Sequence, residues 1–573
     1  MNILDLFNNK KKPKAPWSKY YKEEDMDLKV PNTSVYNYFE SKVSKYGNRN
    51  CIDYYGNKVN YNELLNKIDL CAKGLYDAGV RKGDVVTICL PNTLEGIIAF
   101  FATNKIGGIV NFMHPSSSEN EIKDSLNRTN SRVIFLNDLN YIKVRNIEKD
   151  IKTCRIILVS IYGYMPLFNK IRRPLEARIK VDFSSNNSLY ILWNIFLIKS
   201  RKIHVDNYIV DENKEAPAII LHSGGTTGTP KGVVLSNGNL IAFVESAMIG
   251  QSYLVEGDAC LALMPIFHGF GIVHSVLYPL CIGMNVILRP KFDVKEYCQM
   301  VAKYKPQILM GVPTLFESLL MEWQGKNIDL SFLKCILVGG DVLKDDLRNR
   351  INKFLKKNNA NIKVCAGYGL SEAVCGVALG DPTNQKDNTI GIPLPGIYVG
   401  IFNSNDEEVP YGENGEICVC GPTVMKGYYN NQEETDIALH THKDGNIWLH
   451  TGDLGSMDED GFIKYSSRLK RMIISSGYNI YPNMIEQLIE THPSVAKCIV
   501  VGIPHKHKME VPKAYVVLKN RKTKKELLLL EFKKICKNNL PKYSWPYKYE
   551  FVDELPVTKV GKIDFKSLQN GNK

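Results

Sequence analysis

The chain has 573 residues, of which 44% are hydrophobic and 23% are charged. This composition excludes wholesale disorder, collagen-like repeats and a small disulfide-stapled protein. Lys and Arg (73) exceed Asp and Glu (60), which gives a net charge of +13 and permits anionic ligands or an anionic membrane surface without requiring either. Nothing in the distribution of charge points to nucleic acid.

Signals for disulfides, export and membrane spanning are weak. The 14 cysteines form no C-x-x-C pair, and the closest two, Cys418 and Cys420, alternate as on one face of a strand. We expect reduced structural thiols in a cytoplasmic protein, rather than a metal site or a disulfide framework. Residues 1–17 lack the apolar core of a signal peptide. The longest apolar run, 189–198, is half of the ~20 residues that a spanning helix needs, so we expect a soluble or peripheral protein.

The first part of the chain alternates between helix and strand patterns. Apolar residues recur at helical spacing from Tyr61 to Ala78, and Gly79 then suits a C-terminal cap. Continuous apolar runs follow, which are typical of strands buried on both faces of a parallel sheet. These runs are Val85–Leu90, Arg132–Leu136, Arg155–Ser160, Ala218–Ser223, Cys260–Pro265, Asn285–Arg289, Ile308–Pro313, Cys335–Gly340 and Lys363–Gly369. The alternation favours an α/β fold.

Residues 163–204 interrupt this alternation, because they combine many basic residues with the apolar run at 189–198. One interpretation follows the general rule for charged runs: an amphipathic helical excursion packs on the body and its charges are solvated. The other interpretation is a basic, apolar patch that makes peripheral contact with a membrane.

Short alternating strands with Gly, Pro and Asn turns appear after residue 390 and predict a small antiparallel, barrel-like unit. From Arg468 to the end, the pattern predicts a compact α+β region. Its helix patterns are Met484–Glu490 and Lys524–Lys537, and its strand patterns are Cys498–Gly502 and Ala514–Leu518.

A glycine-rich segment, SGGTTGTPKG, spans Ser223–Gly232 directly after a predicted buried strand. Its glycines allow backbone N–H groups to converge on an anion, its threonines add donors, and Lys231 adds a positive charge. This chemistry suits a polyphosphate. The segment is not a Walker loop, because Lys231 precedes glycine rather than Ser or Thr.

This segment resembles throughout the phosphate loop of the AMP-forming, acyl-activating enzymes, a family that includes acyl-CoA synthetases, 4-coumarate–CoA ligases, nonribosomal adenylation domains and firefly luciferases. Four further blocks follow in the family's order. In the block GYGLSE, the resemblance implies that Tyr368 lies against adenine, Ser371 touches the α-phosphate and Glu372 holds Mg²⁺. In the block TGDLG, it implies that Asp453 binds the ribose hydroxyls.

The third block, Ser467–Glu486, resembles the family's junction between its two domains. The resemblance implies that Arg468 binds ribose or phosphate and that Lys470 is the hinge. The chain departs from the family pattern at Ser467, where glycine is usual, and at Asn483-Met484, which replaces the usual x-Glu before Ile485. The second departure lies at a helix start, where we expect Asn483 to act as a cap. The fourth block, PVTKVGKID, implies that Lys562 is the catalytic lysine.

The complete set of implied site residues is as follows. The catalytic residues are Lys562, Glu372, Thr227 and Lys231. The ATP and AMP site comprises Ser223, Gly224, Gly225, Thr226, Thr227, Gly228, Thr229, Lys231, Gly340, Gly367, Tyr368, Gly369, Ser371, Glu372, Asp453, Arg468 and Lys562. The acyl pocket comprises His268, Gly339, Ala366 and Gly376, and the CoA channel comprises Ser475, Ser476, Gly477 and Tyr478.

The resemblance implies an α/β fold with a large N-terminal body of stacked, mostly parallel sheets and a small antiparallel barrel-like unit. Residues 1–467 would bind AMP and the acid, and residues 468–573 would form a small, mobile α+β domain that carries the catalytic lysine. The implied reaction uses ATP and Mg²⁺ to convert an acid into acyl-AMP, with release of pyrophosphate, and then transfers the acyl group to CoA.

The small residues of the implied pocket and the excursion at 163–204, which resembles one in bacterial medium- and long-chain fatty acyl-CoA synthetases, indicate a fatty acid. Alternatives are an aryl or 4-coumarate-type CoA ligase, an enzyme that loads a carrier protein, and an inactive nucleotide-binding scaffold. The sequence leaves the exact acid, the acceptor and the oligomeric state open.

Overall fold

The computed structural model describes residues 13–570 except 154, 167–188, 206–207, 211–212, 224–230, 384, 476–477, 507, 521–522 and 558–562. The chain divides into two compact units: unit 1 comprises residues 1–399 and 419–449, and unit 2 comprises residues 400–418 and 450–573. This division rests on packing and not on motion, so the predicted mobile domain from residue 468 stays a prediction. Among the described residues, no helix has both the length and the apolar character that a membrane crossing requires.

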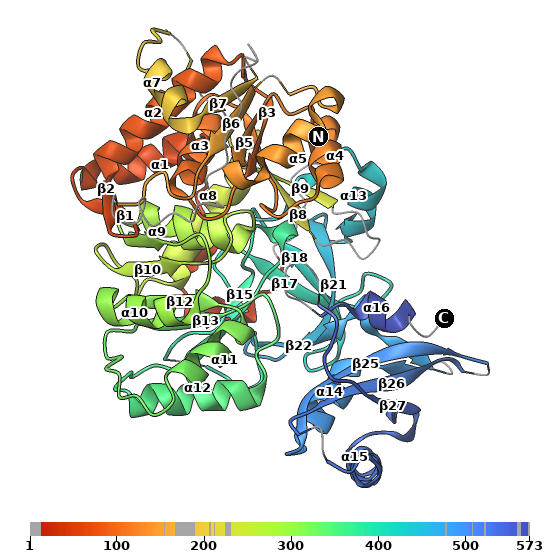
Figure 1. Cartoon of the computed structure of the whole chain (residues 1–573). Helices are drawn as coiled ribbons and strands as arrows, with labels where there is room; N and C mark the ends of the chain where they lie inside the picture. The colour runs from red at the N-terminus through yellow and green to blue at the C-terminus, as the bar shows by residue number, and fades with distance from the viewer. Residues whose placement is uncertain are drawn as a thin grey trace. The chain divides into compact units, whose positions relative to one another are not determined.

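An eight-stranded sheet in unit 1 carries the predicted phosphate segment (Figure 1). Its pairs from β8 to β7 are parallel, and only the pairs of β9 with β8 and β19 are antiparallel. The strands, in spatial order, are β19 (Gly427–Tyr428), β9 (Lys231–Ser236), β8 (Pro217–Ser223), β4 (Ile109–Phe112), β3 (Val85–Cys89), β5 (Val133–Asn137), β6 (Arg155–Val159) and β7 (Tyr190–Leu192). The continuous apolar runs therefore became central strands, as the sequence predicts.

A nine-stranded sheet, also in unit 1, has the same character: its central pairs are parallel and its edge pairs are antiparallel. Its strands, in spatial order, are β16 (Ile392–Pro393), β15 (Ala378–Leu379), β14 (Val364–Tyr368), β13 (Cys335–Val338), β12 (Ile308–Gly311), β10 (Ala259–Ala262), β11 (Asn285–Leu288), β1 (Asn50–Tyr54) and β2 (Asn57–Asn60). The predicted α/β fold with mostly parallel sheets is confirmed.

Two helices of unit 1 are apolar on nearly all sides. Every residue of α3 (Leu94–Lys105) is buried, and α8 (Asn237–Gly250) is buried along most of its length. Helix α3 contacts β3 and β4, whereas α8 contacts β9 as well as η8 (Phe270–Leu277) and α9 (Tyr278–Cys281), which adjoin the nine-stranded sheet. Helices of this kind are typical of the interior of a large protein, so α3 and α8 belong to the core between the sheets.

Several other helices of unit 1 pack on the faces of the sheets. Helices α10, α11 and α12 pack on β10, β12, β13 and β14 through one apolar cluster (Figure 1). Helices α4 and α5 pack similarly on β3, β5 and β6. The bounds are α1 (Val35–Val43), α2 (Tyr61–Asp77), α4 (Glu119–Thr129), α5 (Tyr141–Asn146), α10 (Val294–Tyr304), α11 (Pro313–Glu322), α12 (Asp345–Lys357) and α13 (Gln432–Ala438).

The apolar run at 189–198 is not one helix. Its first residues form β7, which extends the eight-stranded sheet beside β6, and the rest forms α7 (Trp193–Ser200). The inner face of α7 packs on α2 at Gly74, where any added side chain would collide with Phe196 and Ser200. This part of the predicted excursion therefore packs on the body, while residues 167–188 lie outside the described residues.

A five-stranded sheet has the order β17 (Tyr398–Phe402), β18 (Gly415–Cys420), β21 (Ile447–Met457) and β20 (Leu439–Thr441), and β22 (Ile463–Arg468) also pairs with β21. The pairs of β21 with β20 and β22 are antiparallel, which confirms the predicted antiparallel unit.

The end of unit 2 is α+β, as predicted. Its antiparallel strands are β23 (Ile473–Ser475), β24 (Tyr478–Ile480), β25 (Val495–His505) and β26 (Met509–Leu518), and β27 (Lys548–Phe551) adds parallel to β26. Helices α14 (Pro482–Glu490) and α15 (Lys525–Asn539) bury an apolar cluster against them, and α16 (Phe565–Asn570) lies against β25.

Candidate active site

The predicted phosphate segment connects two paired strands of unit 1. Ser223 ends β8 and Lys231 begins β9, and the two residues are partners in the antiparallel register. The pairing places the residues that flank the loop side by side and confirms that the segment follows a buried strand. Between them, the predicted site residues Gly224, Gly225, Thr226, Thr227, Gly228 and Thr229 lie outside the described residues.

Lys231 is held by an acidic side chain that the sequence patterns did not single out. Its Nζ forms an ion pair with Glu434 Oε2 and lies 4.7 Å from the centre of the Tyr428 ring. Glu434 is in the first turn of α13, where the backbone N–H groups favour a negative charge, and Asn431 caps this turn by accepting a hydrogen bond from the Glu434 N–H. The lysine charge is thus balanced by a carboxylate that a phosphate group could displace.

Glu372 is coupled to the same group of side chains. It lies in a single 3-10 turn, η9 (Ser371–Ala373), and its Oε1 accepts a hydrogen bond of 3.0 Å from the Tyr428 hydroxyl. Burial, together with the nearby Glu372 carboxylate, raises the pKa of Tyr428, so Tyr428 remains a donor at neutral pH. Tyr428 therefore connects Lys231 with Glu372, although these two residues are 141 positions apart in the sequence.

The backbone around Glu372 is tightly packed. Val374 has φ 66, a left-handed conformation that costs a β-branched residue free energy and is often found at functional sites. A Cβ on Gly369 would collide with the carbonyl oxygen of Cys375, so only glycine fits there. Gly340, at the end of the neighbouring strand β13, also has a positive φ of 77. Gly367 and Tyr368 end β14 and pair with β15. This predicted adenine-binding segment therefore lies next to η9, the turn that contains Glu372.

The residues predicted for the acyl pocket come together in unit 1. The Cβ that Gly269 lacks would collide with the Val374 carbonyl, so the segment that carries His268 touches the turn after Glu372. The Cβ of a residue at Gly339 would lie 3.5 Å from the Gly367 oxygen, next to the buried Ala366 on β14. At Gly376, the nearest atom would be on the Phe243 ring of α8, at 2.9 Å. The structure groups these residues, while their contact with an acyl chain stays a prediction.

A buried polar chain supports the strand that leads into the phosphate segment. Asn111 on β4 donates to Thr87 and Ser125, so its Oδ1 is left to accept, and His222 Nε2 donates to it at 2.8 Å. Burial, and secondarily the positive charge of Arg128 and the neighbouring His268, lowers the pKa of His222 to about 4. His222 is therefore neutral at physiological pH. It was not predicted as a site residue, because a histidine inside a buried strand carries no pattern of its own.

In unit 2, Asp453 and Arg468 are cross-strand partners on β21 and β22. Arg468 Nε lies 3.0 Å from Asp453 Oδ1; the arginine side chain is half exposed and the aspartate is buried. The two residues predicted to bind the ribose are thus adjacent, although their roles stay predictions.

The predicted hinge, Lys470, is exposed in the short turn η10 (Leu469–Arg471) that follows β22. In the predicted CoA channel, Ser475 and Tyr478 pair across β23 and β24. Ser476, Gly477 and the predicted catalytic Lys562 lie outside the described residues.

The prediction that Asn483 caps a helix is wrong. Helix α14 begins at Pro482, and Asn483 is already inside its first turn. Its side chain accepts a hydrogen bond from Arg471 and donates one to the Ser466 carbonyl. Asn483 therefore connects α14 with the segment around the predicted hinge.

Comparisons with known proteins agree with this arrangement. Residues 39–429 match the family model described as AMP-binding enzyme, and residues 484–562 match the model described as AMP-binding enzyme C-terminal domain. A long-chain-fatty-acid–CoA ligase of Bacillus subtilis is 32% identical over 561 residues, which cover 96% of each chain. A probable 4-coumarate–CoA ligase 3 of Dictyostelium discoideum is 30% identical over 522 residues, 89% of each chain.

Among solved structures, the ATP-bound RpMatB-BxBclM chimera B1 is 25% identical, with a TM-score of 0.80, and covers 94% of this chain and 99% of its own. The chain belongs to the AMP-binding enzyme family, the adenylate-forming ligases. The resemblance stated from the motifs and the prediction of an AMP-forming acid–thiol ligase are both confirmed at the level of this family.

Proposed function

We propose that this protein joins a medium- or long-chain fatty acid to CoA in two steps, using ATP. In the first step, a carboxylate oxygen of the acid attacks the α-phosphorus of ATP, the bond to the bridging oxygen breaks, and pyrophosphate leaves. In the second step, the CoA sulfur attacks the acyl carbon of acyl-AMP, and AMP leaves. The observation that carries the proposal is the group formed by Lys231, Glu434, Tyr428 and Glu372 beside the phosphate segment.

The first step brings two anions together, so its main obstacle is electrostatic. Lys231 supplies a positive charge next to the phosphate segment, and the incoming phosphates compete with Glu434 for it. Partial burial strengthens this competition, since the side chains of Lys231 and Glu434 are only 16% and 27% exposed. Stabilisation of developing charge by prearranged groups is usually the largest catalytic contribution.

Glu372 is the residue that would hold Mg²⁺. Its carboxylate is a hard oxygen ligand in a segment predicted to face the phosphates, and Mg²⁺ commonly takes only one or two protein carboxylates and keeps its waters. The Tyr428 hydroxyl bond orients this carboxylate. When bound, Mg²⁺ neutralises charge on the phosphates.

We assign the second step to the segment Ser475–Tyr478, which would border the pantetheine arm, and the first step to Lys562. This division of labour follows the family resemblance. It requires the region from residue 468 to present different residues in the two steps, with Lys470 as the hinge.

Two features support a fatty acid as the substrate. The relative from Bacillus subtilis is named as a long-chain-fatty-acid–CoA ligase and aligns over nearly the whole chain. The predicted pocket residues include Gly339 and Gly376, which lie near the rings of Phe270 and Phe243, so their surroundings are apolar, as an alkyl chain requires. The second candidate is an aryl or 4-coumarate-type substrate, which the Dictyostelium relative favours.

The test is pyrophosphate release from ATP across a panel of acids, with AMP release measured with and without CoA. We expect medium- and long-chain fatty acids to give the highest kcat/KM and AMP release to require CoA. Preference for coumarate or another aryl acid would refute the fatty acid. AMP release that requires an acyl carrier protein would refute CoA as the acceptor, and no pyrophosphate release with any acid would favour a nucleotide-binding scaffold.

We also propose that the outer face of α7 touches an anionic membrane surface, from which a fatty acid could be taken. Ile195 and Ile198 are 42% and 56% exposed there, and the exposed Lys199, Arg201 and Lys202 follow. Apolar side chains flanked by basic ones are the combination that binds anionic bilayers. The wild-type protein should sediment with phosphatidylserine vesicles. The Ile195→Ser, Ile198→Ser double variant should remain in the supernatant.

The matched control for this experiment is the Leu139→Ser, Ile142→Ser double variant, because these side chains are 49% and 53% exposed elsewhere in unit 1. Equal capture of both double variants would refute the role of α7. We propose a cytoplasmic location, because the scattered cysteines fit reduced thiols rather than a disulfide framework.

A further inference from the structure

A thiol, an imidazole and a carboxylate lie together in unit 2, and none of them has a role in the proposed reaction. Cys418 and Glu416 are two residues apart on β18 and so point to the same face of the strand. The Cys418 Sγ lies 3.6 Å from Nδ1 of His450 on β21, and Glu416 Oε2 lies 2.9 Å from the same nitrogen. The three atoms all lie within 4.8 Å of one another, which is close enough for one metal ion to bind all three.

The spacing matches the edge of a tetrahedral zinc site. With Zn–S at about 2.3 Å and Zn–N at about 2.05 Å, a tetrahedral angle separates sulfur and nitrogen by about 3.5 Å. The observed separation of Cys418 Sγ and His450 Nδ1 is 3.6 Å. Nitrogen and carboxylate oxygen would be about 3.4 Å apart. The Glu416 oxygen therefore has to move outward slightly, which its soft terminal torsion allows.

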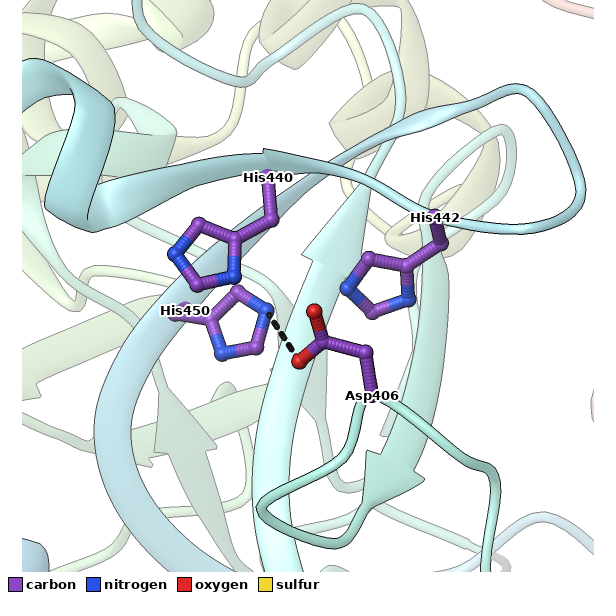
Figure 2. Close-up of side chains that lie close together, drawn as sticks. All are labelled: Asp406, His440, His442 and His450. Atoms are coloured by element: carbon purple, nitrogen blue, oxygen red, sulfur yellow. Dashed lines mark ion pairs between the residues drawn. The ribbon is translucent and has the colours of Figure 1, made fainter.

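The imidazole has a second carboxylate on its far side. His450 Nε2 lies 3.6 Å from Asp406 Oδ1, as the dashed line in Figure 2 marks. A carboxylate beside the second nitrogen of a metal-binding histidine is common, because it favours the tautomer whose first nitrogen can bind metal. At 3.6 Å, the Asp406 oxygen is beyond direct hydrogen-bond distance, and Nδ1 faces Glu416 Oε2 at 2.9 Å, so zinc binding requires the ring proton to sit on Nε2 beside Asp406. Glu416 is also oriented, since its Oε1 accepts a hydrogen bond of 2.7 Å from the Gly452 N–H.

The charge at this position calls for a cation. The side chains of His450 and Glu416 are 9% and 19% exposed and Cys418 is fully buried, so water screens Glu416 poorly, whereas the Asp406 side chain is 37% exposed. Cys418 would bind as the thiolate, and its proton would pass to solvent when the metal binds.

We propose that Cys418, His450 and Glu416 bind a zinc ion, with Asp406 as the residue that positions His450. Thiolate, imidazole and carboxylate together form a ligand set that zinc accepts, and three protein ligands leave a fourth position for water. The ion would clamp β18 to β21 and thereby steady the strand that carries Asp453. The sequence predicts reduced structural thiols, because its cysteines are scattered and form no C-x-x-C pair. This inference is independent of the proposed substrate.

The experiment uses the full chain, loaded with Zn²⁺ and dialysed against a metal-free buffer. Inductively coupled plasma mass spectrometry should find about one zinc per chain, and Co²⁺ in its place should give a sulfur-to-cobalt charge-transfer band. Cys418→Ser should abolish the band and lower retained zinc to below roughly a tenth of the wild-type amount, and Asp406→Asn should weaken zinc affinity about 10–100-fold. Cys420→Ser, two residues along the same strand, is the matched control and should keep both.

Several outcomes would overturn the proposal. They are the absence of retained zinc in the wild-type chain, a cobalt spectrum without the thiolate band, and equal loss of zinc in Cys420→Ser and Cys418→Ser. The other histidines drawn in Figure 2 test a different ligand set: zinc lost in His440→Ala or His442→Ala but retained in Cys418→Ser would also overturn it. Circular dichroism checks the fold of each variant, and if Cys418→Ser is unfolded, the wild-type cobalt spectrum and Glu416→Gln decide the question.

Discussion

Protonation of His222 should couple the stability of β8 and β9, which flank the predicted phosphate segment, to pH. This histidine is the residue before Ser223 on β8, and its Nε2 donates to Asn111 in a buried polar chain. Burial lowers the pKa of His222 from 6.5 to about 4, with Arg128 and His268 adding to the effect. At a pH between these two pKa values, His222 is protonated in the unfolded chain and neutral in the folded chain.

The sign and size of the effect follow from this difference. The full contribution of His222 to the free energy of unfolding is present above pH 6.5 and is lost as the pH falls toward about 4. The slope in this window is about 1.4 kcal/mol per pH unit, and the total loss is roughly 3 kcal/mol. The figure is an upper bound, because the His222 side chain is only partly buried and water screens part of the charge.

The perturbation is His222→Gln, which keeps an amide donor for Asn111 and removes the titration. Urea unfolding would be followed from about pH 4 to about pH 8, with hydrogen exchange of peptides from β8 and β9 as a local readout. We expect wild type and variant to run parallel above pH 6.5, while below it the wild type loses about 1.4 kcal/mol more per pH unit. The exposed His204 provides the control variant His204→Gln. Parallel curves for His222→Gln throughout the acid range would refute the reasoning.

Three further predictions concern catalysis and packing. Glu434→Gln should free Lys231 for phosphates and lower the KM for ATP up to about fivefold, since a partly exposed ion pair contributes about 1 kcal/mol; an unchanged KM would contradict the competition. Lys562→Ala should lose acyl-AMP formation but still convert supplied acyl-AMP and CoA to thioester, whereas a similar loss of both steps would refute the division of labour. Gly369→Ala should lower the free energy of unfolding by about 1–3 kcal/mol through overpacking, and Gly380→Ala, whose nearest neighbour atom would be 3.5 Å away, should have little effect in the same denaturation assay.

The sequence by itself determined the elements, their order and the family. The apolar run predicted as a strand at Val85–Leu90 is β3, and the helical spacing that begins at Tyr61 is α2, with Gly79 adopting φ 88 beyond its end. These features are local: hydrophobic period, cap residues and motif order all lie within short windows of the chain. For the same reason, the motifs located Lys231, Glu372 and Asp453 as a set without any knowledge of their neighbours.

Only the tertiary structure decided which side chains meet. Glu434 and Tyr428 join Lys231 and Glu372 because β19 pairs with β9 and α13 follows it, and a charge or a ring at those positions has no local signature. The sequence predicts Asn483 as a helix cap, but Asn483 lies inside α14, where its side-chain amide accepts from Arg471 and donates to the Ser466 carbonyl. Cys418 and His450 became neighbours through strands that are adjacent in the sheet. Strand order and burial bring distant residues within a few ångströms, and no periodicity along the chain records that distance.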